Sequence, residues 1–270
     1  MNRRKFISVV TSAFLLSISS QLMASDTSET EHKSHDMSKM PENWIKDEQI
    51  AMLIYPGFTA LDLIGPQYMF AGLMGAKVHI VSETLKPITS DTNITIIPTT
   101  TYDKVPDNLS VLFIPGGGES VIKALSNEKL MNFVRKKGSK AKFITSTCTG
   151  SLILAGAGLL NGYKATSHWV ARDALSAGGA IPIDERVVID RNRITGAGVT
   201  AGIDLGLTVV LLLRDNLYAQ TLQLLAEYAP KPPFNAGTPT TAPKEAVEII
   251  TSMFGNYTKN AQNTVKKALI

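Results

Sequence analysis

The sequence predicts an α/β protein in which a mostly parallel sheet is covered by helices on both faces. From Ile45 onward, short apolar runs alternate with longer stretches of helical periodicity, which is typical of strands joined by crossover helices. Several of these runs end in turns that contain glycine or proline, as strands do before a helix begins. The chain has no visible internal repeat of roughly 20–50 residues, so we do not expect a solenoid or a propeller.

The expected elements follow one another along the chain. Strands are expected at 50–55, 78–81, 111–114, 142–145 and 164–166, hairpins at 88–97 and 187–195, and helices at 61–74, 121–125, 129–137, 151–158, 201–213, 218–227 and 244–269. The Gly65-Pro66 pair is expected at the entrance of the first helix. Because ligands of such sheets bind beyond the carboxyl ends of the strands, the residues that follow strands are the candidates for chemistry.

The N-terminus has the features of an export signal. Arg3, Arg4 and Lys5 precede a short apolar run at 9–18, and a small-residue cleavage site follows Ala24. The run is shorter than the ~20 residues that a transmembrane helix needs. We therefore expect 1–24 to be a signal peptide of the twin-arginine type and the mature protein to lie in the periplasm, without membrane attachment. An uncleaved anchor is the alternative.

The rest of the chain divides into three expected segments. Residues 25–44 are polar and predict a flexible linker, 45–243 a single catalytic domain, and 244–270 a helical tail. The leader carries three basic residues and no acid, so its removal lowers the formal net charge from +4 to +1. A nucleic-acid partner is therefore not expected. His32 and His35 lie in the linker, where we expect solvated side chains and not metal ligands.

Cys148 is the only cysteine, so it has no partner for an intramolecular disulfide. The expected strand at 142–145 runs into it, and the small residues Thr149-Gly150-Ser151 follow it. A strand–turn–helix elbow of this kind exposes a nucleophile at the edge of a sheet. The start of the following helix is expected to favour the thiolate. The alternative is a buried structural cysteine.

Three further groups are expected at the same sheet edge. The amides of Gly116 and Gly117, together with that of Thr149, are candidates for an oxyanion hole, although a plain turn has the same sequence. Asp62, flanked by leucines, is either a helix cap or a carboxyl group able to exchange a proton with Cys148. His168 either pairs with Cys148 or is structural, and both readings stay open.

These motifs resemble the ThiJ/PfpI superfamily of class I glutamine amidotransferase-like proteins, from about Glu48 to Leu225. Within it, the chain is most similar to the isonitrile hydratase branch. The resemblance rests on Leu61-Asp62-Leu63-Ile64-Gly65-Pro66, Pro115-Gly116-Gly117, Thr147-Cys148-Thr149-Gly150-Ser151, His168-Trp169 and Pro232-Pro233-Phe234-Asn235-Ala236-Gly237.

The resemblance implies a flavodoxin-like sandwich that forms a homodimer and needs no metal or organic cofactor. It also implies a small-molecule substrate, an isonitrile, which is hydrated to an N-substituted formamide. The catalytic set that it implies is Cys148, Thr149 and Asp62. Protease-like members have a histidine where this chain has Thr149, and glyoxalase and deglycase members have a glutamate where it has Asp62. Both differences count against those activities.

Three other functions are known or conceivable for a protein with these motifs. A transcription regulator of this superfamily would need a DNA-binding domain after Pro243, and 27 residues are too few for one. A redox sensor in which Cys148 is oxidised to the sulfinic acid would use the same thiol. Hydrolysis of another amide or ester would also use it. The last two stay open alternatives to isonitrile hydration.

Overall fold

The structure is a computed structural model that describes residues 40–270. Its centre is a seven-stranded sheet in the order β10-β11-β7-β6-β1-β2-β5, in which only β10 and β11 pair antiparallel. These strands are β1 (Gln49–Leu53), β2 (Lys77–Ser82), β5 (Thr100–Thr101), β6 (Leu109–Ile114), β7 (Phe143–Thr147), β10 (Val187–Asp190) and β11 (Arg193–Gly196). The expected mostly parallel sheet is therefore confirmed.

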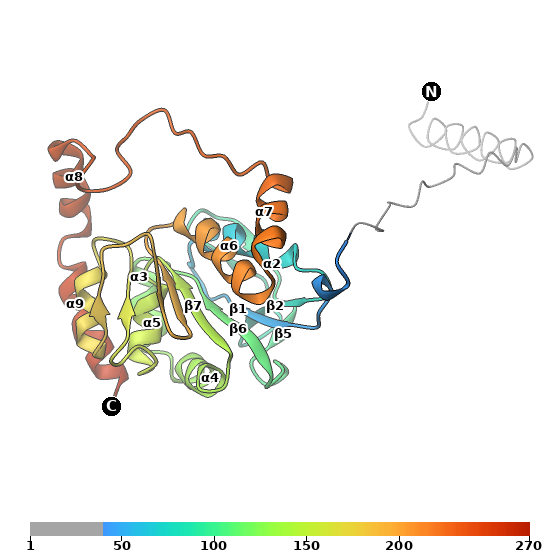
Figure 1. The fold of residues 1–270 in the computed structure, drawn as a ribbon. Coiled ribbons are helices and arrows are strands. Elements are labelled where there is room, and N and C mark those ends of the chain that lie inside the picture. The colour runs from blue at the N-terminus through green and yellow to red at the C-terminus, as the bar shows by residue number, and fades with distance from the viewer. Residues whose placement is uncertain (1–39) are drawn as a thin grey trace, which may run out of the picture. The chain divides into compact units, whose positions relative to one another are not determined.

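Helices cover both faces of this sheet (Figure 1). On one face α2 and α6 pack against each other, and α6 also contacts β7, β11 and α7. On the other face α5 contacts β6 and β7 and packs against α3 and α9. The helices are α2 (Ala60–Ala71), α3 (Glu119–Leu125), α4 (Glu128–Gly138), α5 (Gly150–Gly156), α6 (Ala201–Leu213), α7 (Asn216–Leu225), α8 (Lys244–Phe254) and α9 (Tyr257–Ala268), with the 3-10 helices η1 (Glu42–Trp44) and η2 (Arg172–Gly178). Among the described helices, none is long and apolar enough to cross a membrane.

The central strands are buried on both faces. Ile50, Leu53 and Phe113 have no exposed surface, because β1 and β6 lie in the middle of the sheet between the two helical layers. This explains why their sequences are continuous apolar runs and do not alternate with polar residues. Phe70 of α2 packs edge-on against Phe113, with ring centroids 6.2 Å apart. The core thereby holds the carboxyl ends of β1, β6 and β7 side by side.

The predicted hairpins are present as β10–β11 and as β3 (Ile88–Thr89) with β4 (Thr95–Ile96). The predicted strand at 164–166 is β8 (Lys164–Ala165), which pairs with β9 (Ile181–Pro182) outside the main sheet. The two-residue strand β5 was not predicted, because it is too short to show a pattern.

The expected helix entrance at Gly65-Pro66 is wrong, since α2 begins at Ala60 and contains the pair. The pair faces α6 instead: a Cβ on Gly65 would lie 3.0 Å from Cγ1 of Ile203, and a Cβ on Gly202 would lie 3.0 Å from Pro66. The small residues therefore allow the two helices to approach closely.

The C-terminal tail also differs from the prediction, because two helices replace the single one expected over 244–269. Gly255 has a φ of +46° between α8 and α9, a left-handed conformation that ends a helix. None of the residues of α8 is buried, whereas α9 buries Tyr257, Ala261 and Val265. An extended segment leads from α7 across to α8 (Figure 1).

The packed unit comprises residues 42–270. It includes Trp44, the last residue of the expected linker, which is buried and donates a hydrogen bond from Nε1 to Asp215 over 3.1 Å. The Trp44 ring also packs edge-on against Tyr218 at a centroid distance of 4.7 Å. The expected signal peptide, and with it His32 and His35, lies outside the described residues.

Candidate active site

Cys148 lies in the turn between β7 and α5, at the carboxyl edge of the sheet. Its φ is +57°, a left-handed backbone conformation that is uncommon for residues other than glycine, asparagine or aspartate. Gly150 permits this turn, because a Cβ there would lie 2.7 Å from the carbonyl oxygen of Pro115. The predicted strand–turn–helix elbow is therefore present.

Four hydrogen bonds hold the backbone of Cys148 in this conformation. Its amide donates to the carbonyl oxygens of Gly196 and Ala197, at 3.1 and 2.7 Å. Its carbonyl oxygen accepts from the hydroxyl groups of Ser151 and Ser167, at 3.1 and 3.0 Å. A strained residue persists when its surroundings over-determine it, and strain of this kind is concentrated at functional sites.

Asp62 lies in the first turn of α2 and is fully buried. Its Oδ2 accepts a 2.8 Å hydrogen bond from the amide of Gly116. Its Oδ1 has no nitrogen or oxygen donor among the described residues, and the Cys148 thiol is the group beside this carboxyl. The structure therefore brings Asp62 and Cys148 together, as the sequence suggested.

Burial raises the pKa of Asp62 to about 7, although the hydrogen bonds from Gly116 and Cys148 oppose this rise. Burial, followed by the negative charge of Asp62, raises the pKa of the Cys148 thiol well above its usual range, and the hydrogen bonds from the Thr149 amide and hydroxyl offset only part of this. The expectation that the helix start favours the thiolate is therefore wrong in its net direction. The short helix α5 is outweighed by desolvation and by the neighbouring carboxylate.

Thr149 is buried next to Cys148, and its Oγ1 accepts a 3.1 Å hydrogen bond from the amide of Gly117. Two of the amides expected in the oxyanion hole already have partners within the protein: the Gly116 amide donates to Asp62 and the Gly117 amide donates to Thr149. This corrects the prediction, since these two amides position side chains of the site. Of the three predicted donors, the amide of Thr149 is the one that faces the Cys148 sulfur.

The glycine loop can adopt this conformation only because Gly116 and Gly117 have no side chains. A Cβ on Gly116 would lie 2.6 Å from Oδ2 of Asp62 and 2.7 Å from Oγ1 of Thr149. A Cβ on Gly117 would lie 2.9 Å from the carbonyl oxygen of Gly57. These distances are shorter than van der Waals contact, so the site can close only around glycine.

His168 does not pair with Cys148. Its ring stacks near Trp169 and Phe254, at centroid distances of 5.9 and 5.8 Å, and burial lowers its pKa below the ordinary value. The neighbouring Ser167 makes the contact with Cys148 instead. His79 of β2 hydrogen-bonds the side chain of Gln49 on β1, which is a structural contact. In residues 40–270, no cluster of three or more His, Cys, Asp or Glu side chains is arranged to hold a metal ion.

Two buried tyrosines that the sequence did not indicate complete the surroundings of the site. Tyr55 follows β1 and donates a 2.8 Å hydrogen bond to the carbonyl oxygen of Pro115. Tyr257, the first residue of α9, donates a 3.0 Å hydrogen bond to the carbonyl oxygen of Gly118. No sequence pattern connects these residues to the loop, because they lie far from it along the chain.

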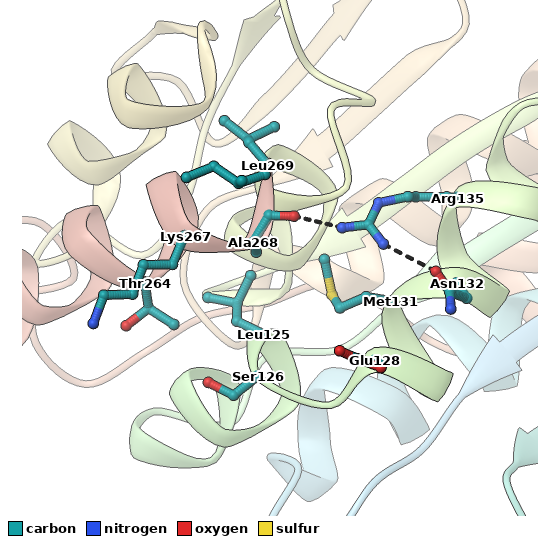
Figure 2. A pocket seen from close by; sticks show the side chains of 11 residues that line it. Leu125, Ser126, Glu128, Met131, Asn132, Arg135, Thr264, Lys267, Ala268 and Leu269 are labelled. Atoms are coloured by element: carbon teal, nitrogen blue, oxygen red, sulfur yellow. Dashed lines mark hydrogen bonds between the residues drawn. The ribbon is translucent and has the colours of Figure 1, made fainter.

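A cavity of about 470 Å³ adjoins the elbow, since it is lined by residues that bond the Cys148 backbone. Its lining includes Ser167, His168, Trp169, Ala197, Val199 and Thr238. Another cavity, of about 440 Å³, lies between α4 and the end of α9 (Figure 2). Neither cavity is lined by a side chain of the elbow itself. The first shares Ser167 and Ala197 with the groups that bond Cys148, whereas the cavity in Figure 2 shares no such residue, so we assign the second cavity no part in the chemistry.

The site combines a cysteine on a strained elbow, a buried carboxyl beside the thiol and a glycine loop, all at the carboxyl edge of a parallel sheet. The sequence profile of the DJ-1/PfpI family matches residues 48–212. The chain belongs to the DJ-1/PfpI family, which confirms the resemblance drawn from its motifs.

Three comparisons describe its place in that family. The chain is 45% identical to the isonitrile hydratase of Pseudomonas putida over 200 residues, which are 74% of this chain and 87% of that protein. It is 34% identical to a deglycase of Thermococcus kodakarensis over 148 residues, 54% of this chain and 88% of that one. The crystal structure of a ThiJ/PfpI family protein from Pseudomonas syringae has 51% identity and a TM-score of 0.82, and the match covers 89% and 98% of the two chains.

Proposed function

We propose that this protein is an enzyme that hydrates isonitriles to N-substituted formamides, with Cys148 as the nucleophile. The observation that carries the proposal is the contact between the Cys148 thiol and the buried carboxyl of Asp62 in a chain related to an isonitrile hydratase. The protein and its relative share the family, and the geometry supplies a nucleophile and an acid in one site.

The first step uses the Asp62 and Cys148 side chains when they carry one proton between them. The reactive form is the less populated of the two, in which the proton has moved from the Cys148 sulfur to Asp62 and Cys148 is a thiolate. Asp62 protonates the terminal carbon of R–N≡C, and the sulfur bonds to the same carbon, which gives the thioimidate R–N=CH–S. Asp62 is left as a carboxylate, and the amide and hydroxyl of Thr149 stabilise the thiolate before attack.

The second step consumes water. The water oxygen bonds to the thioimidate carbon, one of its protons goes to the nitrogen, and the other stays on the new hydroxyl group. When the C–S bond breaks, the hydroxyl proton passes to the Asp62 carboxylate and the carbonyl of R–NH–CHO forms. The thiolate and the protonated Asp62 are regenerated, so one isonitrile and one water give one formamide.

The substituent R is proposed to occupy the cavity beside the elbow. The Trp169 ring and the Val199 side chain supply apolar contact there, and burial keeps the nearby His168 imidazole neutral near pH 7. The lining also contains the charged residues Arg172, Asp184, Glu185 and Arg186, so the cavity offers the R group both apolar and polar contacts.

Export and dimerisation also belong to this proposal. Residues 1–24 are proposed to direct the protein to the periplasm as a cleaved signal peptide. A homodimer is supported by exposed apolar side chains on two adjacent helices, Leu61, Ile64 and Tyr68 on α2 and Leu211 and Leu212 on α6. Large apolar side chains left exposed are a feature of interfaces between subunits.

The test is to incubate the full-length protein with cyclohexyl isocyanide and to measure N-cyclohexylformamide, beside a Cys148→Ala variant of equal thermal stability. We expect product from the wild type and none above background from the variant. Product at an equal rate from both proteins would refute the role of Cys148. Absence of product from the wild type, with Cys148 oxidised cleanly to the sulfinic acid by mild peroxide, would favour a redox sensor instead.

A further inference from the structure

The helix α9 brings a phenol to the active site from outside the part of the chain that the family profile matches. Tyr257 is 2% exposed, and its Oη donates a hydrogen bond to the carbonyl oxygen of Gly118. Thr149 accepts from the amide of Gly117, so the two hydroxyl groups meet adjacent residues of one loop. The Thr149 hydroxyl and the Cys148 sulfur are both close enough to affect the ionisation of Tyr257. The contacts thus join the last helix to two members of the proposed catalytic set.

Burial raises the pKa of the Tyr257 phenol well above its ordinary value, and the sulfur of Cys148 adds to this effect while Thr149 opposes it. Tyr257 therefore stays protonated across the physiological range and acts as a hydrogen-bond donor. Tyr55 has the same property for the same reason, and it holds the other end of the glycine loop at Pro115.

The hydroxyl hydrogens of Thr149 and Tyr257 can be placed in two ways that give each hydrogen an acceptor. In the first, the Gly117 amide donates to Thr149, Thr149 donates to Tyr257, and Tyr257 donates to Gly118. In the second, Thr149 turns its hydrogen to the Cys148 sulfur and Tyr257 turns its own hydrogen to Thr149. The second arrangement places one more donor behind a negative sulfur, which strengthens the hydrogen bond that reaches it.

The position of Tyr257 is fixed from both sides. Phe254 packs edge-on against its ring at a centroid distance of 5.7 Å. At the far end of α9, the guanidinium of Arg135 donates to the carbonyl oxygen of Ala268, as Figure 2 shows. Because α9 also packs on α3 and α5, its first residue is held against the loop.

We propose that Tyr257 is a positioning residue that acts through Thr149: its hydroxyl donates to Thr149 when the Cys148 thiolate forms, so that Thr149 can donate to the sulfur. This role in catalysis rests on the proposed function, but its effect on the thiol does not require an isonitrile. The other ionisable groups that face Cys148 are Asp62 on α2 and Tyr55 after β1. The negative charge of Asp91 raises the pKa values of Asp62 and Tyr55, and that of Glu119 raises the pKa of Tyr257.

The experiment measures the alkylation rate of Cys148 by iodoacetamide as a function of pH in full-length protein. Tyr257→Phe keeps the ring and removes the hydroxyl. We expect its alkylation to be about fivefold slower at neutral pH, and the apparent thiol pKa to rise by about 0.7 pH units, the equivalent of one ordinary hydrogen bond. With cyclohexyl isocyanide, kcat should fall by a similar factor while KM stays unchanged.

The matched control is Tyr218→Phe. Tyr218 is also buried at 4% exposure and donates to a backbone carbonyl, that of Gly72, but it lies on α7 away from the loop. We expect this variant to lose stability and to keep the wild-type alkylation profile. A profile shift of equal size in both variants would overturn the proposal, because it would reflect general loosening of the fold.

A double-mutant cycle with Thr149→Ala tests the route through Thr149. If Tyr257 acts through that hydroxyl, Tyr257→Phe adds nothing to Thr149→Ala, whereas additive effects would overturn the proposal. A folded Tyr257→Phe variant with the wild-type profile would also overturn it. If the wild type fails to hydrate the isonitrile but the profile shifts as expected, the proposed function fails and the positioning role of Tyr257 stands.

Discussion

The carboxyl edge of the sheet and the segment that leads into α8 are opposites in their physical character. At the edge, Asp62, Cys148 and Thr149 are buried, and hydrogen bonds from the glycine loop and neighbouring turns fix their positions. Along 229–241 every residue is exposed, and α8 contains no buried residue. The comparison indicates that the proposed chemistry depends on a pre-organised edge, whereas the segment contributes only exposed residues, of which 237–240 line the cavity proposed for the substrate.

The largest expected effect is that of Asp62→Asn, which removes the proposed acid but keeps the size of the side chain. We expect kcat to fall by about 10²–10⁴, the usual contribution of a positioned general acid. The thiol pKa should fall, because the carboxylate of Asp62 no longer repels the thiolate. Steady-state kinetics and alkylation profiles measure the two effects, and unchanged kcat would contradict the assignment of Asp62.

Gly116→Ala tests whether the glycine loop is as rigid as its contacts imply. The new methyl group would lie 2.6 Å from Asp62 and 2.7 Å from Thr149, so one of these side chains has to move. We expect kcat to fall by about 10²-fold, as a displacement of about 1 Å at a catalytic group does. Gly162→Ala is the control, since a Cβ there meets no atom within 4 Å and the residue lines neither cavity. Its φ of +72° means that this variant should lose stability but keep kcat.

The pH dependence of kcat/KM gives a further test of the buried edge, because it reports the protonation of the Asp62 and Cys148 pair. Two protons occupy the Asp62 and Cys148 pair at low pH, and the first leaves near pH 7 because burial raises the pKa of Asp62 to about that value. Attack requires the singly protonated pair, so kcat/KM should rise about tenfold per pH unit below 7 and level off above it. In Asp62→Asn this limb should vanish, and a pH-independent wild type would contradict the shared proton.

The smallest effect is expected in the exposed segment. Phe234 is 78% exposed, so Phe234→Ala should change the free energy of unfolding by no more than about 0.5 kcal/mol. Phe113 is fully buried in β6, and Phe113→Ala should cost about 3–5 kcal/mol. Denaturant titration compares the two variants. A large loss in Phe234→Ala would mean that the segment is packed against another chain in solution.

Much of the fold was predictable, since β1, β6 and β7 are apolar runs with clear turns, and α6 matches its expected bounds. The helix break at Gly255 was not predicted, because one glycine in an amphipathic pattern does not by itself end a helix. Cys148 and Asp62 could be predicted as site residues, because each lies in a sequence motif that follows a strand.

The hydrogen-bonding details were beyond the sequence. The amides of Gly116 and Gly117 follow a strand as an oxyanion hole would, and only the three-dimensional structure shows that they are already paired. The direction of the thiol pKa was missed for a similar reason, because desolvation depends on burial and the sequence shows only a short helix start. Tyr257 was missed because its contact joins residues that are distant along the chain.

The contribution of α9 has a consequence for how the protein is made and degraded. The chain is synthesised from its N-terminus, so Asp62 and Cys148 emerge from the ribosome long before Tyr257 does. A nascent chain, or one clipped by a protease within α8, would carry every motif of the family and still lack the last hydroxyl group of the network. The hydrogen-bond network proposed around the thiol should therefore be complete only when synthesis has reached the final helix and that helix has packed against the glycine loop.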